Sequence, residues 1–331
     1  MTPLPDQRVI VTPPMLAALA ELFTPLQALG LQVVFNAGVY PMDADTLAEQ
    51  IGGAAAAVVG LDLVGATVFE RCPNLRIVAR NGVGMDMVDL DAATRHGVLV
   101  TAPLGANSTS VAELALGLLI SLLRGVVANH NRVQAGVWRR DQGVELAGKT
   151  LGIIGLGRIG KKVARRALAF DAHVIAHDIL PDEAFAAAHG IDFVTRDALL
   201  ARADIVSLHV PLTPLTVNML DSRAFATMKP GAFLVNTARG SVVNADALVA
   251  ALDSGQLAGA ALDVHPVEGE IDRRLAGRMN VITTTHLGAY THESLAATTR
   301  AAVQSLSQFF QHETPDGLAN PEAARRPASR L

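Results

Sequence analysis

Three glycines near the middle of the chain have the spacing of a dinucleotide-binding turn. Gly155, Gly157 and Gly160 lie between the apolar segment KTLGII and the helical segment KKVARRALAF. In such a turn the first glycine makes the bend, the second lets the backbone approach a pyrophosphate, and the third lets helix and strand pack closely. The alternative is an ordinary glycine turn in a doubly wound sheet.

An acid after the next apolar segment indicates which dinucleotide would bind. The segment AHVIAHD ends in Asp178, 23 residues after Gly155. A carboxylate at this place would accept hydrogen bonds from the adenosine ribose and would repel a 2′-phosphate. The order of strand, turn, helix, strand and acid therefore predicts a site for NAD rather than NADP.

Four polar residues follow other predicted strands, at the edge where open α/β sheets bind ligands. Arg239 follows AFLVNTA, Asp263 and Glu268 lie at and after the end of AGAALDV, and His286 follows NVITTT. Arginine can hold a carboxylate with two hydrogen bonds, histidine can transfer a proton near neutral pH, and a carboxylate can orient the histidine. This set suits reduction of a carbonyl group. The structural alternatives are a surface cation, a core histidine and loop caps.

The elements that must position these residues form two alternating series of strands and helices. β-Branched runs separated by Ala/Leu-rich segments predict parallel sheets covered by helices. The first series has strand candidates at 8–12, 33–35, 56–60, 76–80 and 98–101, with one helix expected through 15–29. The second has six candidates, at 150–155, 172–178, 203–210, 232–238, 258–264 and 280–285.

The boundary between the two series is expected near Asn107. There Ser110 with Glu113 three residues later has the pattern of a capping box, which would open an apolar helix through about Arg124. A polar arm at 136–149 follows it. The segment 291–311 predicts a long amphipathic helix, and the Pro/Ala/Arg-rich tail after it is expected to be frayed.

Length and composition restrict the class of protein. A chain of 331 residues is long enough for two domains. The 27 basic and 31 acidic residues show no block of one sign, which argues against nucleic acid or an anionic membrane as partner. The apolar run 114–123 is shorter than the roughly 20 residues that span a bilayer, and the start of the chain lacks a secretory pattern. The single cysteine, Cys72, fits a reducing compartment, so we expect a cytoplasmic protein. No metal site is predicted.

The whole set of motifs resembles the D-isomer-specific 2-hydroxyacid dehydrogenase family, the NAD-dependent group that includes phosphoglycerate, glycerate, hydroxypyruvate and D-lactate dehydrogenases. The stretches that carry the resemblance are ARNGVGMDMVDL at 79–90, NSTSVAELALGLL at 107–119, GIIGLGRIG at 152–160, LHVPLTPLT at 208–216, NTARGSVVNADAL at 236–248, GAALDV at 259–264 and TTHLGAYTHES at 284–294.

The resemblance implies an α/β fold of two doubly wound parallel-sheet domains. A Rossmann NAD-binding domain, residues 105–290, would be inserted into a flavodoxin-like substrate domain, residues 1–104 and 291–331. The active site would lie in the cleft between them, with hinges near Asn107 and Thr291. A homodimer would form through the NAD-binding domain and the arm around Trp138, and a monomer mass in light scattering would contradict it.

The resemblance also implies a role for each site residue. Arg239 would hold the carboxylate and carbonyl oxygen of a small 2-oxo acid, His286 would be the general acid/base, and Glu268 would support its imidazolium form. The backbone of Val83 and Gly84 would bind the substrate carboxylate. Besides the three glycines and Asp178, the NAD contacts would be Ser110, Arg158, Ile159, Val210, Pro211, Thr216, Thr237, Ala238 and Asp263. Ser110 is already explained as a helix cap, and only the resemblance gives it a cofactor contact.

The implied activity is the interconversion of a 2-oxo acid and a D-2-hydroxy acid with NAD. The alternative is an NAD-sensing corepressor that binds proteins with the same fold. Oxidation of a phosphonate or phosphite is a minor option, and the residues around the histidine disfavour formate.

Some positions depart from the family pattern. Gly60 stands where phosphoglycerate-type members often have an arginine for the phosphate, which puts 3-phosphoglycerate in doubt unless Arg80 substitutes. His265 stands where an aromatic residue is common. Glu270 lies close enough to Glu268 to leave open which of them partners His286. The other histidines considered, His173, His177, His209, His265 and His292, are assigned structural places.

Overall fold

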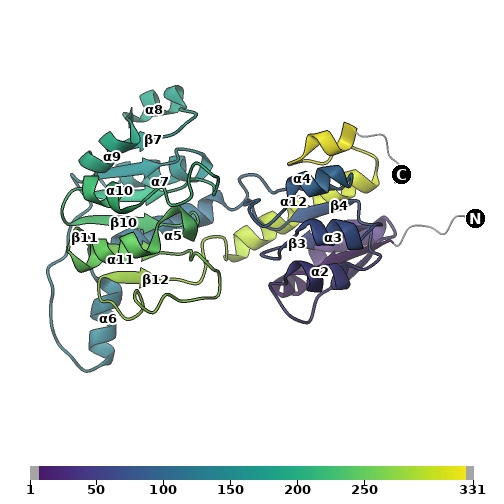
Figure 1. Ribbon diagram of the computed structural model, residues 1–331, viewed down its shortest axis with the longest axis horizontal. Coiled ribbons are helices and arrows are strands. Elements are labelled where there is room, and N and C mark those ends of the chain that lie inside the picture. Colours follow the sequence, from purple (N-terminus) through teal and green to yellow (C-terminus); the bar gives the residue numbers. More distant parts are fainter. Residues whose placement is uncertain (1–6, 326–331) are drawn as a thin grey trace, which may run out of the picture. The chain divides into compact units, whose positions relative to one another are not determined.

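The computed structural model describes residues 7–325, and the chain divides into two units, each with its own sheet (Figure 1). The discontinuous unit comprises the chain up to Asn107 together with the chain from Thr291 onward. The inserted unit comprises residues 108–290. All strand pairs in both sheets are parallel. The predicted fold class, one doubly wound parallel sheet inserted into another, is confirmed.

The sheet of the discontinuous unit has the flavodoxin-like order β2-β1-β3-β4-β5. Its strands are β1 (Arg8–Val11), β2 (Gln32–Phe35), β3 (Ala56–Val59), β4 (Ile77–Arg80) and β5 (Leu99–Thr101). Every residue of β3 and β4 is buried, as expected for central parallel strands covered on both faces. All five strand candidates of the first series are confirmed.

Helices cover both faces of this sheet. One core cluster gathers residues of α2 (Ala44–Ile51), α3 (Ala66–Arg71) and α4 (Leu90–Arg95), and Cys72 is buried in it. The other gathers residues of the amino-terminal helical segment and of α12 (His292–Phe310). The predicted amphipathic helix at 291–311 is thus confirmed, and it packs on the sheet formed by the first hundred residues.

One expectation for this unit is wrong. Residues 15–29 do not form one α-helix: a 3₁₀ segment, η1 (Pro14–Phe23), leaves helical geometry at Leu19 and is followed by the short α1 (Thr24–Ala28). Pro25, in the first turn of α1, has no N–H to continue a helix through this point.

The tail is ordered as far as the structure describes it, and residues 326–331 of the predicted frayed segment lie outside that range. Leu318 bridges to Thr101 at the edge strand β5. The Asn320 amide accepts from Val100 N at 2.8 Å and donates to Val98 O at 2.9 Å, and η3 (Pro321–Arg325) follows. The segment covers an edge whose backbone groups would otherwise lack partners.

The sheet of the inserted unit has seven strands in the order β12-β11-β10-β9-β6-β7-β8. They are β6 (Thr150–Ile154), β7 (His173–His177), β8 (Asp192–Phe193), β9 (Ile205–Leu208), β10 (Ala232–Asn236), β11 (Leu257–Leu262) and β12 (Val281–Thr283). The six candidates of the second series are confirmed, whereas β8, with two residues, was not predicted. The strand order reverses between β6 and β9, which is where such sheets bind ligands.

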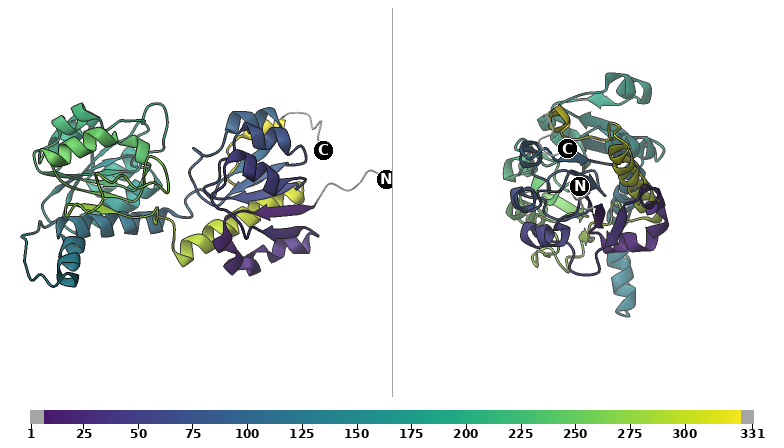
Figure 2. Two further views of the ribbon diagram at one scale, coloured as in Figure 1. Left: turned by 60° about the horizontal axis from the view of Figure 1, so that its bottom comes forward. Right: turned by 90° about the vertical axis from the view of Figure 1, so that its right-hand side faces the viewer.

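Helices also cover both faces of this second sheet. On one face pack α5 (Ser108–Leu123), α7 (Arg158–Leu168) and α8 (Glu183–His189). On the other pack α9 (Arg196–Arg202), α10 (Ser222–Thr227), the short η2 (Gly240–Val242) and α11 (Ala245–Asp253). In contrast, α6 (Val126–Gln134) has no buried residue and points away from the sheet (Figure 2).

The capping box predicted at Ser110 is wrong. α5 begins at Ser108, so Ser110 lies inside its first turn and its hydroxyl donates to Gly288 O at 2.6 Å. Glu113 accepts from Arg166 Nη2 at 3.0 Å. Both side chains make tertiary contacts instead of capping their own helix.

Between residues 7 and 325 no single helix has the length and apolarity to cross a membrane; α5 and α6 meet that test only as a pair, with a bend of 64° between them.

Candidate active site

The glycine turn joins β6 to α7, and two of its glycines are required by close packing. Gly155 has φ of +96°, and a Cβ there would lie 2.7 Å from His209 O. A Cβ on Gly160 would collide with the carbonyl oxygen of Gly155. Any other residue at these two positions would push apart the strand, the turn and the helix.

Gly157, the third glycine of the turn, faces open space. It has φ of −76°, and a Cβ there would meet nothing within 4 Å. It is the N-cap of α7, whose first N–H groups have no partner inside the helix and can bind an anion. Arg158 is exposed beside it, while Ile159 packs against the core. The turn therefore has room for a pyrophosphate at the amino end of α7.

The two kinds of glycine predict different effects of alanine. Gly160→Ala should lower both the thermal midpoint and NADH affinity, because the new methyl group cannot fit. Gly157→Ala should leave the thermal midpoint unchanged yet weaken NADH binding about tenfold or more, because the methyl group blocks close approach to the phosphates. Melting curves and NADH titrations of both variants test this contrast. If Gly157→Ala binds NADH as tightly as the wild type does, the pyrophosphate does not lie against Gly157.

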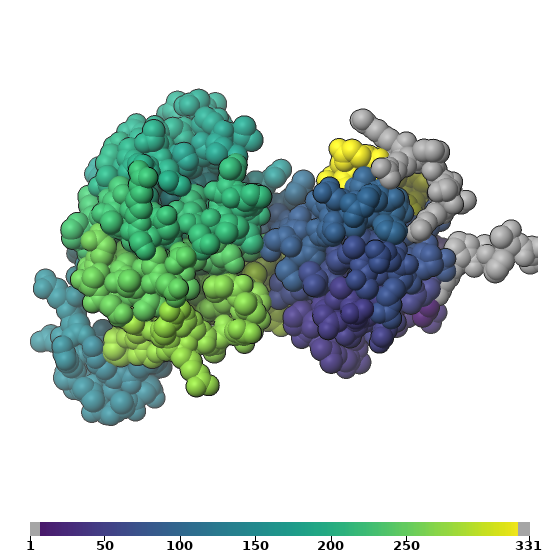
Figure 3. All heavy atoms as spheres, in the orientation of Figure 1, coloured from purple at the N-terminus to yellow at the C-terminus, as the bar shows by residue number. Residues whose placement is uncertain are grey.

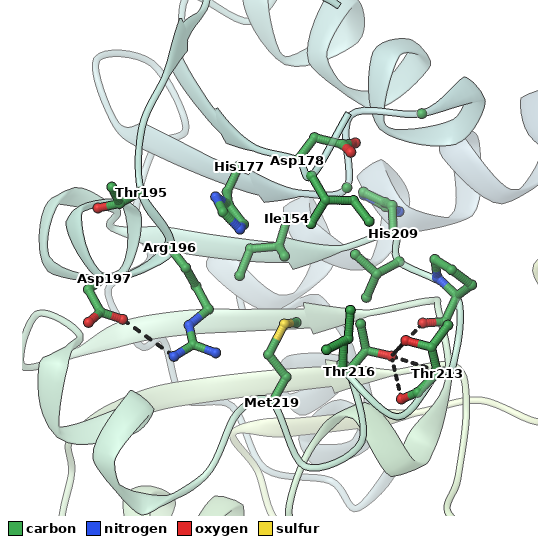
Figure 4. Close-up of a pocket in the computed structure, with 16 residues that line it drawn as sticks. Ile154, His177, Asp178, Thr195, Arg196, Asp197, His209, Thr213, Thr216 and Met219 are labelled. Carbon is green, nitrogen blue, oxygen red and sulfur yellow. Dashed lines mark hydrogen bonds and ion pairs between the residues drawn. The ribbon is translucent and has the colours of Figure 1, made fainter. Parts of the chain in front are cut away.

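A pocket of about 640 Å³ opens beside the turn (Figure 4). Six of the predicted cofactor residues line it: Gly155, Gly157, Asp178, Val210, Pro211 and Thr216. Eight further residues of its wall were not predicted, namely Ile154, Ile179, Thr195, Arg196, Asp197, Thr213, Leu215 and Met219. His177 and His209, which were assigned structural places, also line it. Most of the wall residues that were not predicted follow the carboxyl ends of β7, β8 and β9. Because β8 was not predicted, Thr195, Arg196 and Asp197 could not be placed at the end of a strand.

Asp178 is held in place at the pocket by the backbone. Its Oδ2 accepts from Leu156 N at 2.8 Å, inside the glycine turn, and its Oδ1 accepts from Leu180 N at 2.9 Å. The remaining lone pairs of these oxygens can accept from ribose hydroxyls. The fixed negative charge opposes a 2′-phosphate, so the pocket fits NAD.

Two other parts of the pocket wall differ in charge. Burial lowers the pKa of His209 to about 4, so its ring is neutral near pH 7, and its Nε2 lies 2.9 Å from Ser207 Oγ. Arg196 lies 3.5 Å from Asp197, on the opposite side of the pocket from the turn that Thr213 and Thr216 close (Figure 4). Arg196 therefore has a carboxylate beside it at the pocket wall.

His286 and Glu268 are in direct contact at the carboxyl edge of the same sheet. Nδ1 of His286 lies 3.0 Å from Oε1 of Glu268. Partial burial raises the pKa of Glu268, but the hydrogen bond and charge of His286 outweigh it, so the pKa lies below the usual value. The backbone N–H of Glu270, the other candidate, donates to Val267 O in a turn. The geometry therefore pairs Glu268 with His286.

Asp263 holds the loop that carries His286. It is 1% exposed, and its Oδ1 accepts from Thr284 Oγ1 at 2.6 Å and Leu287 N at 2.7 Å, while Oδ2 accepts from Gly288 N at 2.8 Å. Its backbone carbonyl also accepts from His286 N at 2.9 Å. These bonds support the left-handed backbone of His286, which has φ of +57°.

A buried asparagine that was not predicted shapes the turn at Arg239. Asn236, 1% exposed, donates to Arg239 O at 2.9 Å and accepts from Ala238 N at 3.0 Å. Nη1 of Arg239 donates to Ala238 O at 2.7 Å. The hydroxyl of Thr237 is buried and has no hydrogen-bond partner among the described residues. An asparagine at the end of a strand, just before a turn, was the available signal.

In the discontinuous unit, Arg80 holds the Val83–Gly84 loop from inside. Arg80 is 3% exposed; its Nε donates to Gly84 O at 3.0 Å and its Nη1 donates to Gly60 O. A Cβ on Gly60 would collide with the hydroxyl of Tyr40, which accepts from Leu61 N at 3.0 Å. Tyr40 thus fills the space that a side chain at position 60 would need.

Comparison with known proteins identifies the family of the chain. Residues 116–288 match the profile described as "D-isomer specific 2-hydroxyacid dehydrogenase, NAD binding domain". The chain belongs to this dehydrogenase family. NAD is the cofactor of its inserted unit.

Relatives of the dehydrogenase family match in sequence and in structure. The D-3-phosphoglycerate dehydrogenase of Mycobacterium leprae is 46% identical over 233 residues, which is 70% of this chain and 44% of that relative. A glyoxylate reductase structure from Paecilomyes thermophila has a TM-score of 0.85 and 27% identity over 96% of this chain and all of that one. The Aquifex aeolicus D-lactate dehydrogenase, in complex with NAD and lactic acid, has a TM-score of 0.80 and 28% identity over 96% and 97% of the two chains.

The chain spans less than half the length of the curated relative from Mycobacterium leprae. The corepressor-like alternative has no support in these comparisons. Among residues 7–325, no group of three or more histidine, cysteine or acidic side chains is placed to hold a metal ion.

Proposed function

We propose that the protein is an NAD-dependent oxidoreductase that interconverts a small 2-oxo acid and a D-2-hydroxy acid. The observation that carries this proposal is the contact of 3.0 Å between His286 and Glu268 at the sheet edge that also forms the cofactor pocket. A histidine paired with a carboxylate is suited to move a proton to or from a substrate oxygen.

The contact supports a separate role for each nitrogen of His286. NADH, when bound, supplies the hydride that C2 of the oxo acid receives. Nδ1 of His286 faces Glu268, which leaves Nε2 to give a proton to the C2 oxygen. The carboxylate of Glu268 stabilises the protonated ring before that transfer. In the oxidation direction, neutral His286 takes the proton from the hydroxyl group.

The remaining polar groups are proposed to bind and orient the two ligands. Arg239 would hold the substrate carboxylate and the oxygen on which charge develops. The backbone of Val83 and Gly84 would bind the carboxylate from the discontinuous unit. Ala238 O, the unpartnered hydroxyl of Thr237 and Asp263 would surround the nicotinamide amide.

The discontinuous unit supports a substrate without a phosphate. A phosphate dianion needs cationic donors. Gly60 carries no side chain, its space is filled by Tyr40, and the buried guanidinium of Arg80 is committed to two backbone carbonyls. We therefore propose a short, unphosphorylated 2-oxo acid.

Oxidation of NADH and NADPH in the presence of single 2-oxo acids tests the activity and the substrate class together. The panel contains glyoxylate, hydroxypyruvate, pyruvate, phosphohydroxypyruvate and branched or aromatic analogues. We expect turnover with NADH on unphosphorylated acids, and little with NADPH because Asp178 opposes the 2′-phosphate. Faster turnover of phosphohydroxypyruvate would overturn the substrate class. Tight NADH binding without turnover on any acid would overturn the dehydrogenase.

A second copy of the chain is proposed to cover the arm around Trp138. The side chain of Trp138 is 88% exposed, and α6, which precedes the arm, has no buried residue and forms a bulge on the inserted unit (Figure 3). Apolar surface left in water in this way commonly marks an interface.

A further inference from the structure

The loop after β11 is fastened to the histidine loop by a second imidazole, that of His265. Its Nε2 lies 2.9 Å from the backbone carbonyl of Thr284. A carbonyl only accepts, so Nε2 carries the proton and donates it. Thr284 lies two residues before His286, and Glu268 lies three residues after His265. The bond therefore joins the segment that carries the carboxylate to the segment that carries the acid/base histidine.

The backbone of His265 also packs against the arginine turn. A Cβ on Gly240 would collide with the carbonyl group of His265, so Gly240 is needed for this close approach. Gly240 directly follows Arg239. His265 is thus in contact with all three segments that carry the proposed catalytic side chains.

His265 also acts on Glu268, the carboxylate that must stay paired with His286. Burial raises the pKa of Glu268, and the bond to His286 lowers it more, with the backbone and the charge of His265 acting in the same direction as His286. The side chains of His286 and Glu268 are 25% and 34% exposed, so packing around them is incomplete. Their separation consequently depends on how firmly the two loops are held.

We propose that His265 is a positioning residue that holds Glu268 at hydrogen-bond distance from His286 and so sets the rate of the proton step. The inference rests on the proposed dehydrogenase function. A phenylalanine of similar size would fill the same space but could not donate to Thr284 O. Asp263 would still hold the histidine loop, but beyond Asp263 the segment that carries Glu268 would be tied to that loop mainly by the partly exposed pair itself.

The test compares His265→Phe with His265→Gln, whose amide can donate to Thr284 O. We expect His265→Phe to lower kcat about three- to tenfold, the value of one hydrogen bond, without changing NADH affinity. Reduction needs protonated His286, so its rate decreases as the pH rises. A weaker pair stabilises protonated His286 less, so in His265→Phe this decrease should begin at a lower pH than in the wild type. His265→Gln should restore most of kcat and the wild-type pH profile.

A matched control is His189→Gln. His189 Nδ1 lies 2.9 Å from Phe185 O in α8, so it makes the same type of bond away from the site. This variant should keep the wild-type kcat and pH profile. If His265→Phe changes only the thermal midpoint, as a merely structural bond would, the inference is wrong.

A double-mutant cycle with Glu268→Gln decides whether His265 acts through the pair. His265→Phe should have little further effect when Glu268 has already lost its charge. An equal fall in kcat in both backgrounds would overturn the inference while leaving the dehydrogenase intact. A wild-type protein without turnover on any 2-oxo acid would overturn the proposed function, and the inference with it.

Discussion

Replacement of His286 by alanine should lower turnover about 10²- to 10⁴-fold, the usual contribution of a positioned acid/base group. The variant loses the nitrogen that gives the proton, and Glu268 loses its partner at 3.0 Å. NADH affinity should change little, because the pocket beside the glycine turn contains neither residue. The measurements are kcat with the best 2-oxo acid and a fluorescence titration with NADH.

The thermal midpoint of His286→Ala is the control for this result. The His286 side chain is 25% exposed, so its truncation should leave the thermal midpoint nearly unchanged. Burial raises the pKa of Glu268 but the bond and charge of His286 lower it more, so this carboxylate is ionised near neutral pH and is protonated only as the pH falls through that lowered value. Unchanged turnover in His286→Ala would remove His286 from the mechanism.

The fold was predictable where local sequence and burial agree. Parallel strands that are covered on both faces must be apolar and β-branched, and eleven such runs were found. β8 has two residues, which is too short for any periodicity to appear. The Ser110–Glu113 pattern was misleading because Gly288 O and Arg166, both distant in sequence, take these two side chains. Tertiary contacts decided the outcome.

The candidate site was predictable because parallel strands end at one edge of a sheet. Arg239, Asp263, Glu268 and His286 could therefore be grouped without knowing any distance. The residues that hold them could not be found in this way. Asn236 bonds the backbone of its own turn, Thr284 bonds the carboxylate of Asp263, and His265 bonds the backbone of Thr284. The last two bonds join separate loops and depend on how those loops pack. The choice between Glu268 and Glu270 also needed the geometry.

A substitution of Asp263 should disturb the loop that carries His286 more than a substitution elsewhere. Asp263→Ala removes the acceptor of three donors, the N–H groups of Leu287 and Gly288 and the hydroxyl of Thr284. Leaving one buried donor and two part-buried donors without partners should lower the free energy of unfolding by about 2–4 kcal/mol. Turnover should fall as well, because the backbone of His286 would lose the support of its left-handed conformation.

Urea denaturation and kcat of Asp263→Ala, Asp263→Asn and Asp221→Ala test this. Asparagine keeps one oxygen but turns an N–H₂ group toward one of the donors, so Asp263→Asn should fall between alanine and the wild type. Asp221 is the matched control, since it accepts one backbone N–H, from Ala224 at 2.9 Å at the start of α10. Its removal should cost about 1 kcal/mol, as for other helix caps, and leave kcat unchanged. If Asp263→Ala is no less stable than Asp221→Ala, the buried carboxylate does not hold the catalytic loop, and water or a rearranged backbone must satisfy its donors instead.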